Sequence, residues 1–369
     1  MTFAVVTGGG TSGHVIPAMA VLEALVDAGH DPSELAYVGS RRGVESSMVP
    51  ALGVRCAFLP VSGLQRSVSP RSLLANAVFP FRLLAATRGA RRLLREWSPR
   101  VVVSVGGYAS EPAARAAVAA GVPLVCISYD MVPGLATRRQ ARRAVACAVA
   151  FEGSGLPRAV VTGAPVRRAV RTMQPSERRA AVRAAMGIDD DCLLVTVVGG
   201  SLGSAALNSG VPAIVASLAA AGVAARVVHI TGRRYSDGAV VPGAGTVTVR
   251  TLPHEDDMPS LLAATDVLVS RAGASTVAEI AAIGVASVLV PWPAAADDHQ
   301  TRNAGWLGDA GAASVVREGP NLAEDLAAEV LRLARDPAAR HALSSSARSM
   351  GGLHRGNSLT ELITDAALA

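Results

Sequence analysis

A short apolar strand, a glycine-rich turn and a helix start follow one another at the beginning of the chain. The predicted strand is Phe3-Ala4-Val5-Val6, the turn runs on to Gly13, and His14 opens a helical pattern. Glycines let the backbone approach a bound group closely, and the free N–H groups of the following helix favour an anion. A histidine here lies beside developing charge, and its unperturbed pKa of about 6.5 suits a proton acceptor.

The same turn also matches a dinucleotide-binding fingerprint, with the spacing Gly8-x-Gly10-x-x-Gly13. An NAD enzyme requires an acidic residue at the end of the second strand to hold the ribose. The predicted second strand, 35–38, runs instead into Gly39-Ser40-Arg41-Arg42. NAD is therefore disfavoured, whereas an NADP enzyme remains open because the two arginines could meet a 2′-phosphate.

Strands and helices alternate along the rest of the chain, which predicts parallel sheets covered by helices. A length of 369 residues exceeds one ordinary core and favours two domains. The rhythm pauses at 161–167, and a second series of strands begins at 193–198 and ends in another glycine turn. We expect an α/β protein with two doubly wound Rossmann-like domains facing a cleft, the first over 1–163 and the second over 164–345.

Composition excludes several classes of protein. Half of the residues are hydrophobic and 17% are charged, as in globular proteins. The four cysteines lie far apart without metal-type spacing, which is typical of reduced core residues in a cytosolic protein. No apolar stretch approaches the roughly 20 residues that a spanning helix needs. We expect a protein that is neither secreted nor transmembrane.

Basic charge is concentrated in the first predicted domain, which has 17 arginines against 9 acidic residues, and the chain contains no lysine. Nucleic acid is disfavoured as a partner because only 3% of residues are aromatic. A run of arginines and apolar residues from Arg66 to Trp97 suits an anionic membrane surface. It also suits an amphipathic helix packed on its own sheet, which is the reading that this segment alone favours.

The second domain contains a polar constellation after a predicted strand. Arg271-Ala272-Gly273-Ala274-Ser275 opens a helix whose amides could hold a diphosphate. Glu279 lies one to two turns into this helix, where it is either a ligand of ribose hydroxyls or an ordinary solvated charge. Gln300 follows the next strand and could pair with sugar hydroxyls. Three adjacent residues, Asp297-Asp298-His299, cannot easily converge on one ion, so a metal site is disfavoured.

Several motifs in this order resemble the MurG family of glycosyltransferases, and the resemblance covers nearly the whole chain. The motifs are Gly9-Gly10-Thr11-Ser12-Gly13-His14 with Pro17, Gly106-Gly107-Tyr108, Pro133-Gly134-Leu135, Gly163-Ala164-Pro165-Val166-Arg167, Gly199-Gly200-Ser201, Arg271 to Glu279, and His299-Gln300 with Asn303-Ala304.

The resemblance implies a GT-B fold and an inverting transfer of N-acetylglucosamine from UDP-N-acetylglucosamine to the muramyl 4-hydroxyl of lipid I. The product would be lipid II, which serves peptidoglycan synthesis, cell shape and division. The enzyme would lie peripherally on the cytoplasmic face of the cell membrane. No cofactor would be obligatory, and a C-terminal helix within about 346–369 would pack back on the first domain.

The resemblance also implies roles for single residues. His14 would be the base for the acceptor hydroxyl, Glu279 would bind the ribose, and Gln300 the N-acetylglucosamine hydroxyls. The remaining donor-side candidates are Thr11, Ser12, Gly13, Arg167, Ser201, Arg271, Ala274 and Ser275, with Arg167 and Ser201 at the diphosphate. The acceptor-side candidates are Gly107, Tyr108 and Asp130.

Two segments depart from the family pattern. Ile127-Ser128-Tyr129-Asp130 stands where the family has His-Glu-Gln-Asn, and Leu202 replaces the glutamine of a Gly-Gly-Ser-Gln-Gly turn. The first departure falls in the acceptor-facing domain. Three alternatives therefore stay open: a related transferase with another lipid or a natural-product acceptor, a UDP-N-acetylglucosamine 2-epimerase, and a non-catalytic sugar-nucleotide module.

Overall fold

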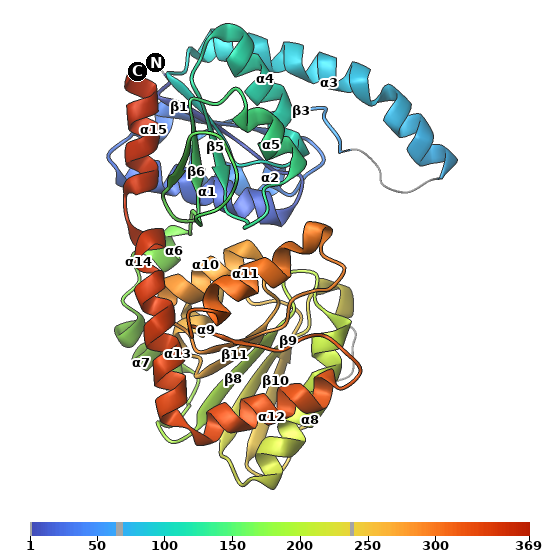
Figure 1. Ribbon diagram of the computed structural model, residues 1–369, viewed down its shortest axis with the longest axis vertical. Helices are drawn as coiled ribbons and strands as arrows, with labels where there is room; N and C mark the ends of the chain where they lie inside the picture. The colour runs from blue at the N-terminus through green and yellow to red at the C-terminus, as the bar shows by residue number, and fades with distance from the viewer. Residues whose placement is uncertain (1, 64–68, 237–239) are drawn as a thin grey trace. The chain divides into compact units, whose positions relative to one another are not determined.

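The computed structural model describes residues 2–63, 69–236 and 240–369, and the chain divides into two compact units (Figure 1). The first unit contains Met1–Arg168 and Gly356–Ala369, and the second contains Ala169–Arg355. The sequence placed these changes near 163 and 345. Residues up to 168 stay with the first unit because Arg167 and Arg168 form ion pairs with Glu23 and Asp27 of its first helix.

The first unit is built on a seven-stranded parallel sheet with the order β3-β2-β1-β4-β5-β6-β7. Its strands are β1 (Ala4–Thr7), β2 (Leu35–Ser40), β3 (Arg55–Leu59), β4 (Val101–Ser104), β5 (Leu124–Ser128), β6 (Ala146–Val149) and β7 (Ala159–Val161). The four residues of β1 and the four of β4 are all buried. Burial on both faces explains why these strands read as continuous apolar runs rather than as alternating patterns.

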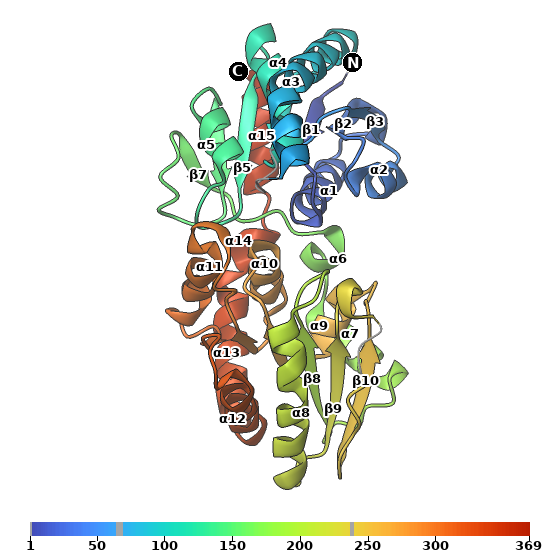
Figure 2. The same ribbon diagram turned by 90° about the vertical axis from the view of Figure 1, so that its right-hand side faces the viewer.

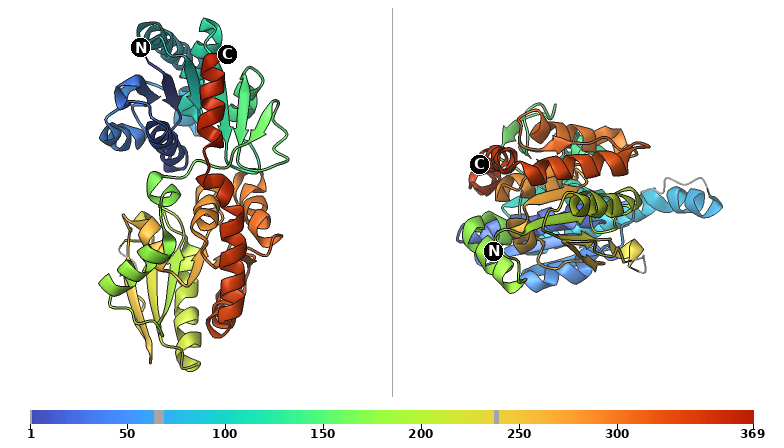
Figure 3. Two further views of the ribbon diagram at one scale, coloured as in Figure 1. Left: turned by 90° about the vertical axis from the view of Figure 1, so that its left-hand side faces the viewer. Right: turned by 90° about the horizontal axis from the view of Figure 1, so that it is seen from below.

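Helices cover both faces of this sheet. They are α1 (Ser12–Asp27), α2 (Glu45–Met48), α3 (Pro70–Trp97), α4 (Glu111–Ala120), α5 (Leu135–Ala141) and α15 (Ser358–Leu368). The end of α3 packs with α4 over a core that includes Leu94, Trp97 and Val102. The C-terminal helix α15 lies along β4, β5 and β6 and also contacts α1 (Figure 3). The last segment of the chain is therefore part of the first unit.

The second unit repeats this plan with a six-stranded parallel sheet in the order β10-β9-β8-β11-β12-β13. The strands are β8 (Leu193–Val198), β9 (Ala225–Ile230), β10 (Val247–Leu252), β11 (Val267–Ser270), β12 (Ser287–Leu289) and β13 (Ser314–Val315). The helices are α7 (Pro175–Ala185), α8 (Ala205–Ala220), α9 (Met258–Ala264), α10 (Ala274–Ile283), α11 (His299–Gly308), α12 (Leu322–Arg335), α13 (Pro337–Met350) and α14 (Gly352–Arg355), with α6 (Arg168–Arg171) at the change of unit.

Helices α8 and α12 pack together, and Figure 2 shows them at the lower end of the second unit. The residues between them and the sheet include Leu207, Ile214, Leu326 and Val330, none of which is exposed. Their spacing on each helix places one apolar stripe against the strands. This core holds β8 and β11 side by side.

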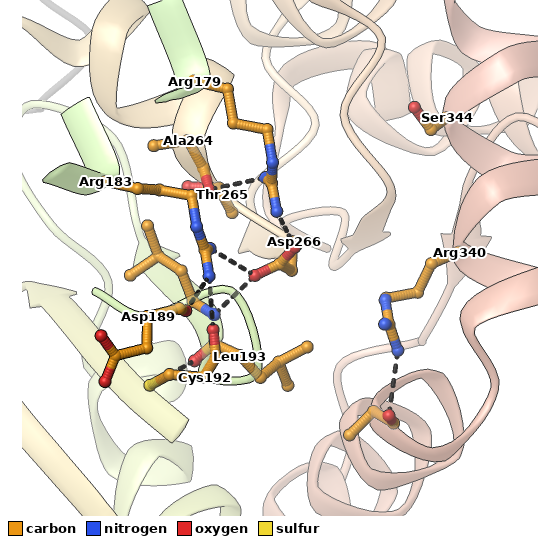
Figure 4. A network of polar contacts seen from close by, with 12 residues as sticks. Arg179, Arg183, Asp189, Cys192, Leu193, Ala264, Thr265, Asp266, Arg340 and Ser344 are labelled. Carbon is orange, nitrogen blue, oxygen red and sulfur yellow. Dashed lines mark hydrogen bonds and ion pairs between the residues drawn. The ribbon is translucent and has the colours of Figure 1, made fainter. Parts of the chain in front are cut away.

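A partly buried ion network fixes the amino end of β11 (Figure 4). The Asp266 carboxylate accepts hydrogen bonds from Arg179 (2.5 Å), Arg183 (3.0 Å) and the Leu194 N–H (2.7 Å). The side chain of Arg183 is 5% exposed and also donates to the Asp189 and Cys192 carbonyls. A buried charge is tolerated when it is paired and hydrogen-bonded in this way. The network joins α7 to the amino ends of the strands, and the glycine turns lie at their carboxyl ends.

In both sheets the chain order reverses between two central strands. Neighbours β1 and β4 form this switch point in the first unit, and β8 and β11 form it in the second. Loops after such strands diverge and leave a crevice at the carboxyl ends, where ligands of doubly wound folds bind. The glycine turns singled out in the sequence follow these four strands.

Candidate functional site

The switch point of the first unit is lined by two glycine turns that touch each other. Gly107 has φ +76°, and a Cβ added there would lie 2.5 Å from the Gly9 carbonyl oxygen and 2.8 Å from His14 Cδ2. Only glycine allows both this left-handed backbone and this close approach. The second turn therefore packs directly against the imidazole ring of His14.

The ring of His14 is held by Tyr129, which follows β5. The Tyr129 hydroxyl donates a hydrogen bond to the Gly13 carbonyl (2.7 Å) and forms a second, short hydrogen bond with His14 Nδ1. The two rings meet edge-on, with centroids 6.0 Å apart and planes inclined by 65°. In the sequence Tyr129 stands out only as a departure from a family motif, because nothing in local spacing predicts a contact across 115 residues of chain.

The environment of His14 favours its neutral form. Burial lowers the pKa of His14 below 6.5, against the opposing effects of the Asp130 carboxylate, a hydrogen bond with the Val105 backbone and the Glu45 carboxylate. Burial also raises the pKa of Tyr129 well above 10, with a further contribution from Asp130. At neutral pH the pair therefore consists of a neutral imidazole and a protonated phenol, and the imidazole is the group that can accept a proton.

A buried carboxylate that the sequence did not reveal supports the first glycine turn. Glu45 is fully buried, and it accepts hydrogen bonds from the Gly10 N–H (3.1 and 3.2 Å) and the Ser40 N–H (2.9 Å). Its side chain occupies the space left by missing side chains at Gly9, Gly39 and Gly43. The absence of Cβ atoms at these glycines is the only signal that could have pointed to it.

The other first-unit candidates lie around the same turns. Thr11 is the N-cap of α1, and its carbonyl accepts from the His14 N–H (3.0 Å). Tyr108 packs over Gly10, where a Cβ would meet its ring at 2.3 Å. Asp130 is half-buried and is close enough to raise the pKa of His14. The Ser12 side chain lies outside the described part of the structure.

Arg167 also belongs to the first unit. Its Nε donates to both carboxylate oxygens of Glu23 (2.9 Å each), and its Nη2 lies 2.7 Å from Glu23 Oε1. The Arg167 side chain is 30% exposed, whereas the Glu23 side chain is only 8% exposed. The ion pair thus orients a partly accessible guanidinium at the end of the segment Gly163 to Arg167.

The switch point of the second unit is lined by turns after three adjacent strands. Ser201 is exposed in the turn that follows β8. In this turn a Cβ at Gly203 would lie 2.0 Å from the Thr231 carbonyl oxygen, so the loops after β8 and β9 are in direct contact. The loop after β9 also holds Ser201, because the Ser201 carbonyl accepts a hydrogen bond from the Arg233 N–H (3.2 Å).

Arg271, which follows β11, links the loops after β8 and β12. Its Nη2 donates to Ser204 Oγ after β8 (2.7 Å), and its Nη1 donates to the Val290 carbonyl after β12 (3.2 Å). Nη1 also lies 2.5 Å from a carboxylate oxygen of Glu318. In the described structure this predicted donor ligand thus orders the surrounding loops, and Glu318 is a partner that the sequence did not suggest.

Two amide side chains at the start of α11 hold the start of α10. Gln300 Oε1 accepts from the Ala272 N–H (3.3 Å) and the Trp292 N–H (3.0 Å), and the fully buried Asn303 donates to the Ala272 carbonyl (3.2 Å). Ala274 and Ser275 form the first turn of α10, whose N-cap Gly273 makes no side-chain cap. Glu279 follows on the same helix and is half-buried.

The predicted membrane segment forms the long helix α3. Its second half is anchored in the core through Leu83, Ala86, Ala90 and Leu94. Exposed apolar side chains lie before and within this half: Val78, Phe81 (73% exposed) and Leu84. Its arginines at 82, 88, 91, 92 and 95 are exposed. The start of the run, residues 66–68, lies outside the described structure. Among the described helices, none is both long and apolar enough to span a bilayer.

Comparison with known proteins identifies the family. The model of the N-terminal domain of glycosyltransferase family 28 matches residues 4–149, and that of its C-terminal domain matches residues 194–355. UDP-N-acetylglucosamine–N-acetylmuramyl-(pentapeptide) pyrophosphoryl-undecaprenol N-acetylglucosamine transferase of Clavibacter michiganensis is 36% identical over 372 residues, covering 100% of this chain and 98% of the relative. The enzyme of the same name from Burkholderia multivorans is 39% identical over 331 residues, or 88% of this chain and 85% of the relative.

A solved structure agrees with these sequence relatives. Acinetobacter baumannii MurG has a TM-score of 0.74 and 26% identity, and the match covers 100% of both chains. The GT-B fold expected from the sequence is confirmed, and the transferase reading is favoured over the NADP enzyme, the epimerase and the binding module. The chain belongs to the MurG family within glycosyltransferase family 28.

Proposed function

We propose that this protein transfers N-acetylglucosamine from UDP-N-acetylglucosamine to the 4-hydroxyl of the muramyl sugar of lipid I, forming lipid II. The observation that carries the proposal is the full-length similarity to transferases named for this activity, such as the Clavibacter michiganensis enzyme at 36% identity. The glycine turns allow the close backbone approach that an anionic sugar donor requires, and the helices α1 and α10 that follow two of them begin without a side-chain cap, so their N-terminal N–H groups favour an anion.

In the proposed reaction His14 is the general base. Its neutral imidazole takes the proton of the acceptor hydroxyl while that oxygen attacks the anomeric carbon. The bond from that carbon to the diphosphate breaks, and UDP departs with the electron pair. Attack from the face opposite UDP inverts the anomeric configuration. Base catalysis of this kind contributes about 10²–10⁴-fold to rate.

On the donor side, we assign the ribose hydroxyls to Glu279 and the N-acetylglucosamine hydroxyls to Gln300. Gln300 Oε1 already accepts two backbone hydrogen bonds, so its amide N–H₂ is the group left to donate to a sugar oxygen. Ser201, Arg167 and the N-terminus of α10 would neutralise the departing diphosphate. Thr11, Ser12 and Gly13 complete the donor side.

The acceptor side would be formed by Gly107, Tyr108 and Asp130. An ionised carboxylate only accepts hydrogen bonds and repels phosphate. Asp130 would therefore face an acceptor hydroxyl or a neighbouring arginine rather than the acceptor diphosphate.

The replacement His14→Ala tests the base assignment. We expect turnover to fall by about 10²–10⁴-fold with little change in donor affinity, because proton removal matters only in the transition state. The assay follows UDP release with and without lipid I, and calorimetry measures donor binding. Wild-type turnover in the variant would refute the base assignment. Epimer formation without acceptor, in the wild-type protein, would refute the transferase proposal.

We further propose that α3 docks on the anionic, cytoplasmic face of the cell membrane. Exposed Phe81 lies beside exposed Arg82, so an apolar side chain could enter the interface while the arginine meets headgroups. Changing Phe79 and Phe81 to Ser and Arg82 and Arg88 to Glu should reduce sedimentation with vesicles that contain phosphatidylglycerol. Activity on a soluble acceptor analogue should persist. Undiminished vesicle binding would contradict this proposal.

A further inference from the structure

The Tyr129 hydroxyl hydrogen-bonds to two groups that set the position and orientation of the His14 ring. One is the carbonyl of Gly13, the residue before the histidine in the first turn of α1, and the other is the ring nitrogen Nδ1. Tyr129 is 6% exposed, so solvent offers little competition for these hydrogen bonds. The tyrosine thereby links the end of β5 to the backbone of Gly13, just before the predicted base, and to the side chain of the base itself.

The direction of these hydrogen bonds determines the histidine tautomer. A hydroxyl has one proton, and the Tyr129 hydroxyl donates it to the Gly13 carbonyl. Its oxygen then accepts a hydrogen bond from His14 Nδ1–H. In the neutral ring this leaves the lone pair on Nε2, which is the nitrogen required to take a proton from a substrate. Because the Tyr129 phenol keeps its proton at neutral pH, this arrangement persists there.

We propose that Tyr129 is a positioning residue for the transfer reaction, which holds the imidazole of His14 in the orientation and Nδ1–H tautomer that place the basic lone pair on Nε2. The proposal rests on the assignment of His14 as the base. Gly107 completes the arrangement by packing against the opposite part of the ring, near Cδ2. The ring is thus fixed by the hydrogen bond with Tyr129 at Nδ1, by a hydrogen bond with the Val105 backbone and by contact with Gly107 at its carbon edge.

Tyr37 provides a matched control. It is fully buried, and its hydroxyl donates to the Gly8 carbonyl (2.7 Å) in the same glycine turn. The described contacts of the Tyr37 hydroxyl do not include His14. Tyr129→Phe and Tyr37→Phe each remove one buried hydroxyl that supports this turn and keep the aromatic ring. Only Tyr129→Phe removes the partner of Nδ1.

The kinetic test compares kcat and donor KM of the two variants with wild type. We expect Tyr129→Phe to lower kcat by about 10–100-fold with donor KM unchanged, because a tautomer error is known to impair histidine bases strongly and a hydroxyl orients less firmly than a carboxylate. Tyr37→Phe should retain kcat within about twofold. Equal kcat losses, with equal losses of melting temperature, would overturn the proposal in favour of a general stabilising role.

A spectroscopic test is independent of turnover. Nitrogen-15 NMR of histidine-labelled protein distinguishes the two neutral tautomers, and His14→Ala identifies the His14 signals among the seven histidines. Wild type and Tyr37→Phe should show the Nδ1–H tautomer at His14, and Tyr129→Phe should show a mixture or the Nε2–H form. An unchanged tautomer in Tyr129→Phe would overturn the proposal. Wild-type turnover in His14→Ala would instead refute the base assignment, while the NMR result would still report whether Tyr129 holds the ring.

Discussion

Replacing Gly107 with alanine should lower turnover by moving His14, even though residue 107 carries no reactive group. The added Cβ would lie 2.8 Å from His14 Cδ2, whereas ordinary contact begins at 3.4 Å. The ring must therefore shift by about 0.6 Å, or the Gly107 turn must shift by a similar amount. Because the new Cβ would also lie 2.5 Å from the Gly9 carbonyl, the turn cannot easily retreat.

The size of the effect follows from this displacement and from backbone strain. A misplacement of about 1 Å near a reacting group costs up to about 10²-fold in rate, so a shift of about 0.6 Å should cost roughly 10–50-fold in kcat. The backbone at Gly107 has φ +76° and ψ 163°, a region essentially restricted to glycine, where another residue costs about 1–3 kcal/mol. We therefore expect a folded variant with a modestly lower melting temperature and a clearly lower kcat.

Gly106→Ala is the matched control for this prediction. Gly106 has a similar φ of +84°. Its added Cβ would lie 2.9 Å from Thr137 Oγ1 but 3.6 Å from the His14 ring, which is ordinary contact, so this variant carries backbone and side-chain strain without displacing the imidazole. The assay measures UDP release with lipid I, together with thermal unfolding of both variants. Equal kcat values for the two variants, or wild-type kcat in Gly107→Ala, would refute the argument that this glycine positions the base.

Three further predictions concern single carboxylates. Glu279→Ala should weaken UDP-N-acetylglucosamine binding by about 1–3 kcal/mol through loss of hydrogen bonds to the ribose, and unchanged affinity in calorimetry would contradict this assignment. Asp130→Asn should keep or raise lipid I turnover and move the acidic limb of the pH profile to lower pH. The base must be neutral to act, and Asp130, like Glu45, raises the pKa of His14 against the dominant effect of burial, so removing the Asp130 charge lowers that pKa. A large loss of turnover, or a move of the acidic limb to higher pH, would contradict this prediction. Glu45→Ala should destabilise the first unit by about 2–6 kcal/mol, since two backbone N–H groups lose a buried acceptor at about 1–3 kcal/mol each; denaturant unfolding measures this, with exposed Ser47→Ala as the control, and equal stability would disprove it.

The pattern of strands and glycine turns was readable from the sequence because its physical causes are local. Strands such as β1 and β8 are buried on both faces, so they appear as continuous apolar runs bounded by glycines. The positive φ angles at Gly107 and Gly203 require glycine itself. Alternation of strands and helices then restricts the topology to doubly wound sheets.

The partners of the site residues could not be read in the same way. Tyr129 meets His14 across 115 positions, and Glu45 meets the Gly10 N–H across 35. Glu318 likewise reaches Arg271 from a loop after β13. Such contacts depend on which strands become neighbours and on how far each loop extends beyond its strand. Neither property has a local signal in residue type or spacing.

The two parallel sheets, the turns at their carboxyl ends and the family are predictable from the sequence alone, since they follow from burial periodicity, glycine conformation and motif order. The fold was needed to show that Arg271 and Gln300 hydrogen-bond to the loops around them, that Arg167 pairs with Glu23, and that a tyrosine contacts the predicted base. The physical reason is that hydrogen bonds and ion pairs act over about 3 Å, and chain segments far apart in sequence come within that range only when the sheet is assembled.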